Sequence, residues 1–99
     1  MAASYRLAIS GAISARIREL YGIARDQGRG AEFRTAIAQG LSKLEEDPVG
    51  FGEPSFRYKH LDLLNYVVIE PPLAIEYCVD EVRKIVYLKL LTLQDPPPG

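Results

Sequence analysis

The sequence predicts a single α+β domain: an N-terminal strand, a helical hairpin and then a three-stranded antiparallel meander, together forming one sheet. Three observations favour this class. A short run near the N-terminus alternates as a half-buried strand does, two later stretches repeat apolar residues at helical spacing, and the second half contains three strand-like runs separated by turn residues. The 99 residues suffice for one domain with one core. We expect the domain to span residues 1–95 and the proline-rich residues 96–99 to form a disordered tail.

The first strand and the first helix follow from the order of residues near the N-terminus. Tyr5–Ser10 alternates large apolar residues with smaller or polar ones, which is typical of a strand with one buried face. Ser10 is a candidate helix cap, because a serine oxygen can accept a hydrogen bond from an N–H of the first turn. The residues that follow carry an apolar stripe at helical spacing: Ile13, Ile17, Leu20 and Ala24.

A second helix is predicted after a glycine-containing break at Gln27–Gly30. It begins near Ala31 and ends at Pro48. Its apolar stripe consists of Phe33, Ile37, Leu41 and Leu44. Gly40 lies beside this stripe, where a small residue allows close helix contact at a propensity cost of about 1 kcal/mol. The short connection predicts that the two helices form an antiparallel hairpin.

The stretch from residue 49 to residue 64 leaves two interpretations open. Gly50, Gly52 and Pro54 indicate a loop, whereas Phe56–Leu61 alternates aromatic and basic residues. This second part is either an edge strand or an extended loop.

The last three strands are predicted at Tyr66–Ile69, Leu73–Asp80 and Ile85–Leu93. Pro71–Pro72 ends the first of them, because proline cannot donate a hydrogen bond to a ladder. In the middle strand, one face is formed by Leu73, Ile75, Tyr77 and Val79. In the last strand, Ile85, Tyr87, Leu91 and Leu93 alternate with Val86, Leu88, Leu90 and Thr92, so both faces are apolar. We expect the helical hairpin to cover one face of the sheet and a tail or a partner to meet the other.

Composition restricts the function classes. The net charge of −1 gives no overall field that would attract nucleic acid or an anionic membrane. Cys78 is the one cysteine, so an internal disulfide is excluded; we expect a buried, inert thiol and a reducing compartment. No apolar run approaches the roughly 20 residues that span a bilayer, and arginines interrupt any signal sequence. We therefore expect a cytoplasmic protein with no membrane partner.

The order of these elements resembles the RelE/ParE superfamily of bacterial toxins from type II toxin–antitoxin modules, which serve in plasmid stabilization. The resemblance covers nearly the whole chain and rests on Tyr5–Ile9, the helical hairpin, the loop Gly52–Pro54, and Ile75–Asp80 followed by Ile85–Leu88. It implies a toxin that acts on mRNA or on a cellular protein such as gyrase and is neutralised by a cognate antitoxin. It also implies no cofactor and no metal. An active enzyme of this family would be a ribosome-dependent mRNA endoribonuclease.

The family's ribonucleases use three groups of residues, and this resemblance gives the candidate site. Basic residues before the sheet correspond to Arg57, Lys59 and His60, which are the candidate catalytic residues. Such cations stabilise charge on the scissile phosphate, and an acid–base group moves the 2′-hydroxyl proton. Candidate RNA contacts are Tyr58, Arg83 and Lys84. An arginine expected on the strand entering the hairpin is missing from residues 68–74, and the basic C-terminal group is missing from residues 94–96.

Other interpretations remain open for the same residues. His60 is also readable as a solvated loop residue, Arg57–Lys59 as an exposed strand edge, and Arg83 and Lys84 as a solvated turn. The alternative function is a non-catalytic protein-interaction domain that retains the fold and has lost the ribonuclease site. A third is a small binding domain unrelated to toxins. Convergence of Arg57, Lys59 and His60 in one concave site would favour the enzyme. The sequence leaves the antitoxin, the target and the oligomeric state open.

Overall fold

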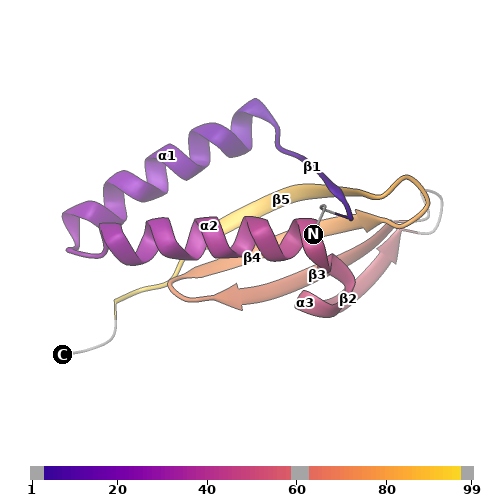
Figure 1. The fold of residues 1–99 in the computed structure, drawn as a ribbon. Coiled ribbons are helices and arrows are strands. Elements are labelled where there is room, and N and C mark those ends of the chain that lie inside the picture. The colour runs from indigo at the N-terminus through magenta and orange to yellow at the C-terminus, as the bar shows by residue number, and fades with distance from the viewer. Residues whose placement is uncertain (1–3, 59–62, 97–99) are drawn as a thin grey trace.

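The computed structural model describes residues 4–58 and 63–96 as a helical layer against one face of a sheet (Figure 1). In chain order the elements are β1 (Arg6–Ala8), α1 (Gly11–Asp26), α2 (Gly30–Glu46), α3 (Pro48–Phe51), β2 (Glu53–Tyr58), β3 (Leu63–Glu70), β4 (Leu73–Asp80) and β5 (Ile85–Leu93). The strand order is β1-β5-β4-β3-β2, with β1 parallel to β5 and the other pairs antiparallel. The predicted α+β class is confirmed. The sheet has five strands instead of the four expected, because β2 adds one to the meander.

The helical hairpin forms as predicted. Ser10 caps α1 by accepting a hydrogen bond from the Ile13 N–H at 3.1 Å. The buried residues of α1 are Ile13, Leu20 and Ala24, all from the predicted stripe. Gly28 in the connection has φ of +75°, a left-handed conformation that glycine adopts without strain.

The second helix lies close against the sheet. It begins at Gly30, one residue before the expected start, and buries Phe33 and Leu44. A Cβ on Gly40 would lie 3.1 Å from the Ile75 Cδ1, so the close contact that this glycine allows is made with β4. Asp47 then caps the short helix α3 by accepting a hydrogen bond from the Gly50 N–H at 3.1 Å.

Within the ambiguous stretch, residues 49–51 belong to α3 and residues 53–58 to an edge strand, residues 63 and 64 begin β3, and residues 59–62 lie outside the described residues. β2 pairs antiparallel with β3 from Glu53↔Val67 to Tyr58↔Leu63. Glu53 and Pro54 therefore belong to a strand and not to the predicted loop. Proline is tolerated there because an edge strand has one side without ladder hydrogen bonds.

The core-facing side of β4 is as predicted, but that of β5 is not. Leu73, Ile75, Tyr77 and Val79 are all buried. Their partners on β5 are Leu93, Leu91, Leu88 and Val86, in that order, so these four residues share the buried face. The predicted grouping of Leu91 and Leu93 with Ile85 and Tyr87 is wrong. Opposite Glu76 and Tyr77, β5 contains one extra residue that has no partner on β4. Because of this bulge, the residues of β5 on its far side face the opposite way from what regular alternation predicts.

No helix in the described ranges 4–58 and 63–96 is long and apolar enough to cross a membrane. Gln94–Pro96 follow β5 without regular structure, and residues 97–99 lie outside the described residues. The domain boundary at residue 95 stays a prediction.

Candidate functional site

The sheet face that α1 and α2 leave uncovered is called here the open face. Its residues alternate with the buried ones: on β4, for example, Glu76 lies between Ile75 and Tyr77. Large apolar side chains gather on it from three strands, namely Phe56, Val67, Ile69 and Leu90, with exposed fractions from 39% to 50%. Exposed apolar side chains concentrated on one face indicate a binding surface, whereas single scattered ones are ordinary.

A polar group lies among these apolar side chains, and Asn65 is its centre. The Asn65 side-chain nitrogen donates to Ser55 Oγ at 2.8 Å and to Glu76 Oε1 at 3.1 Å. Its oxygen accepts from Lys89 Nζ at 3.1 Å and from Cys78 Sγ at 3.3 Å. Asn65 has no exposed surface, and its two donor and two acceptor positions are all used. We call Ser55, Tyr58, Asn65, Glu76, Cys78 and Lys89 the Lys89 cluster.

Lys89 is the bulged residue of β5, and its ammonium group is held by the neighbouring strands. It donates to the Tyr58 hydroxyl and to Asn65, and it lies 3.9 Å from Glu76 Oε1. The ring centroids of Phe56 and Tyr58 are 5.3 Å and 5.0 Å from Nζ, within cation–π range. The hydrogen bond with Tyr58 raises the pKa of Lys89, and partial desolvation offsets some of this. The lysine is therefore charged at neutral pH, with its donors directed at protein groups.

Cys78 lies beneath Lys89 and is buried, as predicted. Burial raises the pKa of its thiol, although the charge of Lys89 and a hydrogen bond with Tyr58 act in the opposite direction. A thiol with a raised pKa carries little thiolate at neutral pH, and thiolate is the nucleophilic form. Cys78 consequently acts as a packing residue and a weak donor to Asn65.

Of the three predicted catalytic residues, Arg57 alone lies within the described residues. Arg57 pairs with Leu64, whose partner on β4 is the buried Val79, so Arg57 lies on the helical side of the sheet. Its charge lowers the pKa of Tyr66 on that side, against a larger increase caused by burial. Lys59 and His60 lie outside the described residues. Whether the three converge is untested, and their catalytic roles stay predictions.

The predicted RNA contacts are divided between two places. Tyr58 lies on the open face in the Lys89 cluster, the opposite side from its neighbour Arg57. Arg83 and Lys84 lie in the turn between β4 and β5. Arg83 is 3.6 Å from Asp80 Oδ2, and Lys84 Nζ lies 4.9 Å from the Tyr5 ring centroid. Of the predicted site residues that the structure describes, Tyr58 alone belongs to the cluster.

The other polar members of the cluster were not predicted from the sequence. Asn65, Glu76 and Lys89 are each a polar residue between apolar or aromatic neighbours within a strand. That shared pattern is a usable signal, because a polar side chain in a sheet interior requires a partner. Three such interruptions on adjacent strands predict a common network once the pairing of the strands is known.

The described part of the open face carries little positive charge. Among the described residues of β2 to β5, Lys89 is the one cationic side chain on this face, and Glu76 lies beside it. Stabilising a phosphodiester transition state requires cations aimed at the developing charge. Here the donors of Lys89 already have partners and the surroundings are apolar. The open face is therefore better suited to contact with a protein surface than with an RNA backbone.

Comparisons with known proteins place the fold. No protein-family model and no curated protein matches this sequence. Among solved structures, a chain in the crystal structure of the archaeal RelE–RelB complex from Pyrococcus horikoshii OT3 is similar to this one, with a TM-score of 0.68 and 19% sequence identity. The match covers 92% of this chain and 96% of that chain. The resemblance predicted from the order of elements is thus confirmed at the level of architecture, and the chain has a RelE-like fold.

Proposed function

We propose that this chain is the toxin-like component of a toxin–antitoxin pair and that it acts by binding a cellular protein through the open face. The observation that carries this proposal is the apolar character of that face around a lysine whose donors are already engaged. A surface of this kind gains free energy when a partner removes it from water, at about 25 cal/mol per Å² of apolar area. Gyrase or another cytoplasmic protein is the target class that the proposal implies.

The fold supports the antitoxin half of the proposal. The similar solved chain was crystallised in a RelE–RelB complex, so a protein of this architecture is compatible with a bound protein partner. Cleavage of mRNA is the less favoured activity, because the middle of the open face offers no second cation beside Lys89 among the described residues of β2 to β5. Removal of one charge-stabilising donor costs a factor of about 100 or more in rate.

The proposal is tested by inducing this chain alone in a bacterial host. We expect growth to slow at confirmed soluble expression, with no new cleavage ends in total mRNA. Leu90→Glu, which puts a charge at the centre of the open face, should restore growth. Its matched control is Ile23→Glu, because Ile23 is similarly exposed but lies on α1. Normal growth with the unaltered soluble chain, or equal rescue by both variants, would contradict the proposal.

A further inference from the structure

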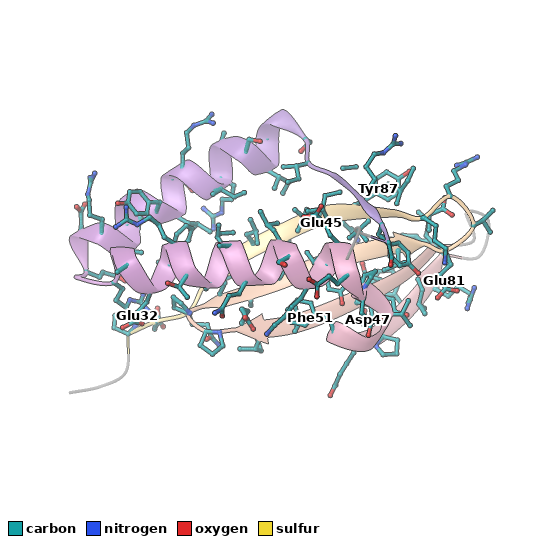
Figure 2. The ribbon with its side chains drawn as sticks, viewed as in Figure 1. Glu32, Glu45, Asp47, Phe51, Glu81 and Tyr87 are labelled. Atoms are coloured by element: carbon teal, nitrogen blue, oxygen red, sulfur yellow. The ribbon has the colours of Figure 1, made fainter. Side chains whose placement is uncertain are left out.

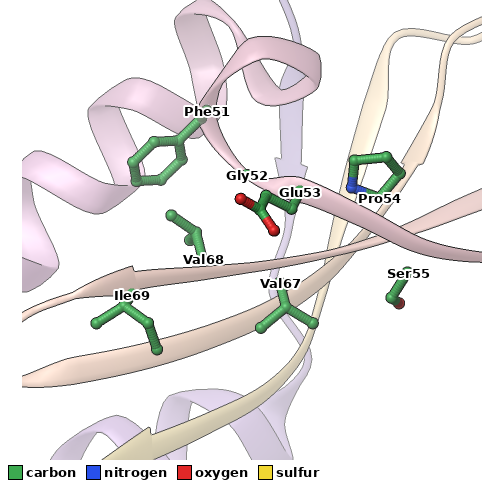
Figure 3. A pocket seen from close by; sticks show the side chains of 8 residues that line it. All are labelled: Phe51, Gly52, Glu53, Pro54, Ser55, Val67, Val68 and Ile69. Atoms are coloured by element: carbon green, nitrogen blue, oxygen red, sulfur yellow. The ribbon is translucent and has the colours of Figure 1, made fainter.

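A second surface feature lies at the edge of the sheet, beside the start of β2. It is a hollow of about 470 Å³ between α3, β2 and β3 (Figure 3). We call it the β3 notch; its lining residues are Phe51, Gly52, Glu53, Pro54, Ser55, Val67, Val68 and Ile69. It is distinct from the Lys89 cluster, with which it shares Ser55 at its margin.

The notch exists because β3 is longer than β2. The ladder between them ends at Glu53↔Val67, whereas β3 continues to Glu70. Beyond Val67, no strand from the described residues 4–58 and 63–96 lies beside the outer edge of β3. An unpaired strand edge presents N–H and C=O groups that can pair with another chain.

The direction of these backbone groups can be worked out from the preceding residues. The Asn65 carbonyl accepts a hydrogen bond from Ser55 Oγ on β2 at 3.5 Å. The Val67 carbonyl oxygen lies 3.0 Å from where a Cβ on Gly52 would be. Both carbonyls thus point toward the β2 side. Alternate residues of a strand direct their backbone groups to the same side, so the N–H and C=O of Ile69 point into the notch.

In the part of the chain that the structure describes, no backbone hydrogen bond occupies the Ile69 groups on that side. Ile69 therefore offers one donor and one acceptor at an open edge. Its side chain is half exposed, at 50%.

The side chains around this edge specify the chemistry of an occupant. Phe51 and Val68 give the notch an apolar wall, and the Glu53 carboxylate points into it (Figure 3). Glu46 and Asp47 lie at the adjoining end of α2, where Asp47 is next to the short helix that carries Phe51 (Figure 2). Of the eight residues that line the notch, Glu53 is the one with a charged side chain.

One lysine also lies near the rim, but it is engaged. Lys43 donates to Glu70 at 3.2 Å, and its Nζ lies 5.2 Å from the Phe51 ring centroid. Its charge is thus balanced by Glu70, and the charge of Glu53 remains for a ligand.

We infer that the β3 notch binds an extended segment of a partner protein, which continues the line of β2 alongside β3. The backbone of the segment pairs with the N–H and C=O of Ile69. An apolar side chain packs against Phe51 and Val68, and a lysine or arginine lies beside Glu53. Backbone pairing supplies affinity in this mode of recognition, and side-chain pockets supply specificity. The inference stands whether or not the chain acts as a toxin.

The experiment uses the full-length protein, its assigned amide spectrum and two capped hexapeptides. One peptide alternates valine with lysine, and the other alternates valine with glutamate. We expect the lysine peptide to shift the amide signals of Gly52, Glu53 and Ile69 in a saturable manner. The glutamate peptide should bind about tenfold more weakly, because a like charge would then face Glu53.

Two variants and one control complete the test. Ile69→Pro should abolish binding and leave the β3–β4 ladder intact, because the N–H that it removes points into the notch. Glu53→Lys should reverse the preference between the two peptides, and it tests the inference even if Ile69→Pro fails to fold. Glu81→Lys is the matched control, since Glu81 is an exposed carboxylate in the turn between β4 and β5 (Figure 2).

Three results would overturn the inference. They are equal affinity for the two peptides, saturation without a shift at Ile69, and an absence of binding. Shifts at the notch that appear on concentrating the protein alone would instead identify a second copy of the chain as the occupant.

Discussion

At the scale of single residues, Asn65 shows how a polar group is accommodated in an apolar sheet. Its amide offers two donors and two acceptor positions, and residues from β2, β4 and β5 take all four. A buried amide left without partners costs roughly 1–3 kcal/mol for each unsatisfied group, so complete pairing is what makes this position stable. Asn65 also links four strands through side chains, in addition to the backbone ladders.

Replacing Asn65 by alanine should therefore be costly. We expect Asn65→Ala to lower the free energy of unfolding by about 2–3 kcal/mol, since it removes four hydrogen bonds and leaves a small cavity. Urea denaturation followed by circular dichroism measures this. Ser55→Ala is the comparison, because it removes one of the four bonds at an exposed residue, and it should cost less than about 1 kcal/mol. Equal losses for the two variants would show that the network contributes nothing beyond a single bond.

At the scale of elements, the contact between α2 and β4 fixes the distance between the two layers. Gly40 has no Cβ, and one placed there would meet the end of the Ile75 side chain at 3.1 Å. Gly22 on α1 has nothing within 4 Å of the same position. Gly40 thus lies in a crowded position and Gly22 in an open one, although each glycine lowers the stability of its helix by about the same amount.

This difference gives a paired prediction. Gly40→Leu should destabilise the protein by about 1–3 kcal/mol, because the added side chain overpacks the layer between α2 and β4. Gly22→Leu should be neutral or stabilise by up to about 1 kcal/mol, because leucine favours helix and meets open space. Thermal denaturation of both variants checks this. A stabilising Gly40→Leu would show that the layers separate easily.

Features with a local cause were predictable at this scale, and features set by a neighbouring strand were not. The Ser10 cap and the stripe from Phe33 to Leu44 depend on residues a few positions apart, and both are present. The phase of β5 depends on an extra residue opposite β4, Lys89, and a single lysine in this strand is as compatible with regular alternation as with a bulge. Regular alternation was therefore the natural assumption, and it gave the wrong face to Leu91 and Leu93.

In the candidate site, too, the features that depend on a neighbouring strand were not predictable from the sequence. Arg57 and Tyr58 are neighbours in sequence, which suggested a common surface. Once β2 is known to be a strand, alternation places them on opposite faces. The Lys89 cluster depends on three cross-strand pairings and was not predictable from a list of basic residues. Its sequence signal is the polar interruption of each apolar strand.

At the scale of the whole molecule, the two-layer arrangement leaves the sheet half covered. The helical side contains the main core, including Tyr77, whose hydroxyl donates to the Pro48 carbonyl at 2.7 Å. Burial raises the pKa of both Tyr77 and Tyr66, and it raises that of Cys78 on the open side. The folded state thus holds all three protons more tightly than the unfolded state does.

The pH dependence of stability follows from these directions. A raised pKa in the folded state contributes stability that is fully present below the unfolded pKa, and that stability is lost as pH rises toward the folded pKa. The unfolded values are about 8.5 for cysteine and about 10 for tyrosine. We therefore expect the free energy of unfolding to fall as pH rises from about 9, as measured by urea denaturation at several pH values. Tyr77→Phe should make this fall shallower, and an unchanged slope in that variant would contradict the assignment.

The bulge on β5 has a consequence for insertions and deletions in the chain. Losing one residue from a strand normally reverses the facing of every residue that follows, which exposes core side chains. Lys89 is the extra residue opposite β4, so its loss would leave Leu88, Leu90 and Leu91 in plain alternation, with Leu88 and Leu91 still facing the helices. Lys89 can thus be deleted without moving any core residue of β5 to the other side. The open face and the layer that holds the fold together can therefore be altered separately by the loss of a single residue.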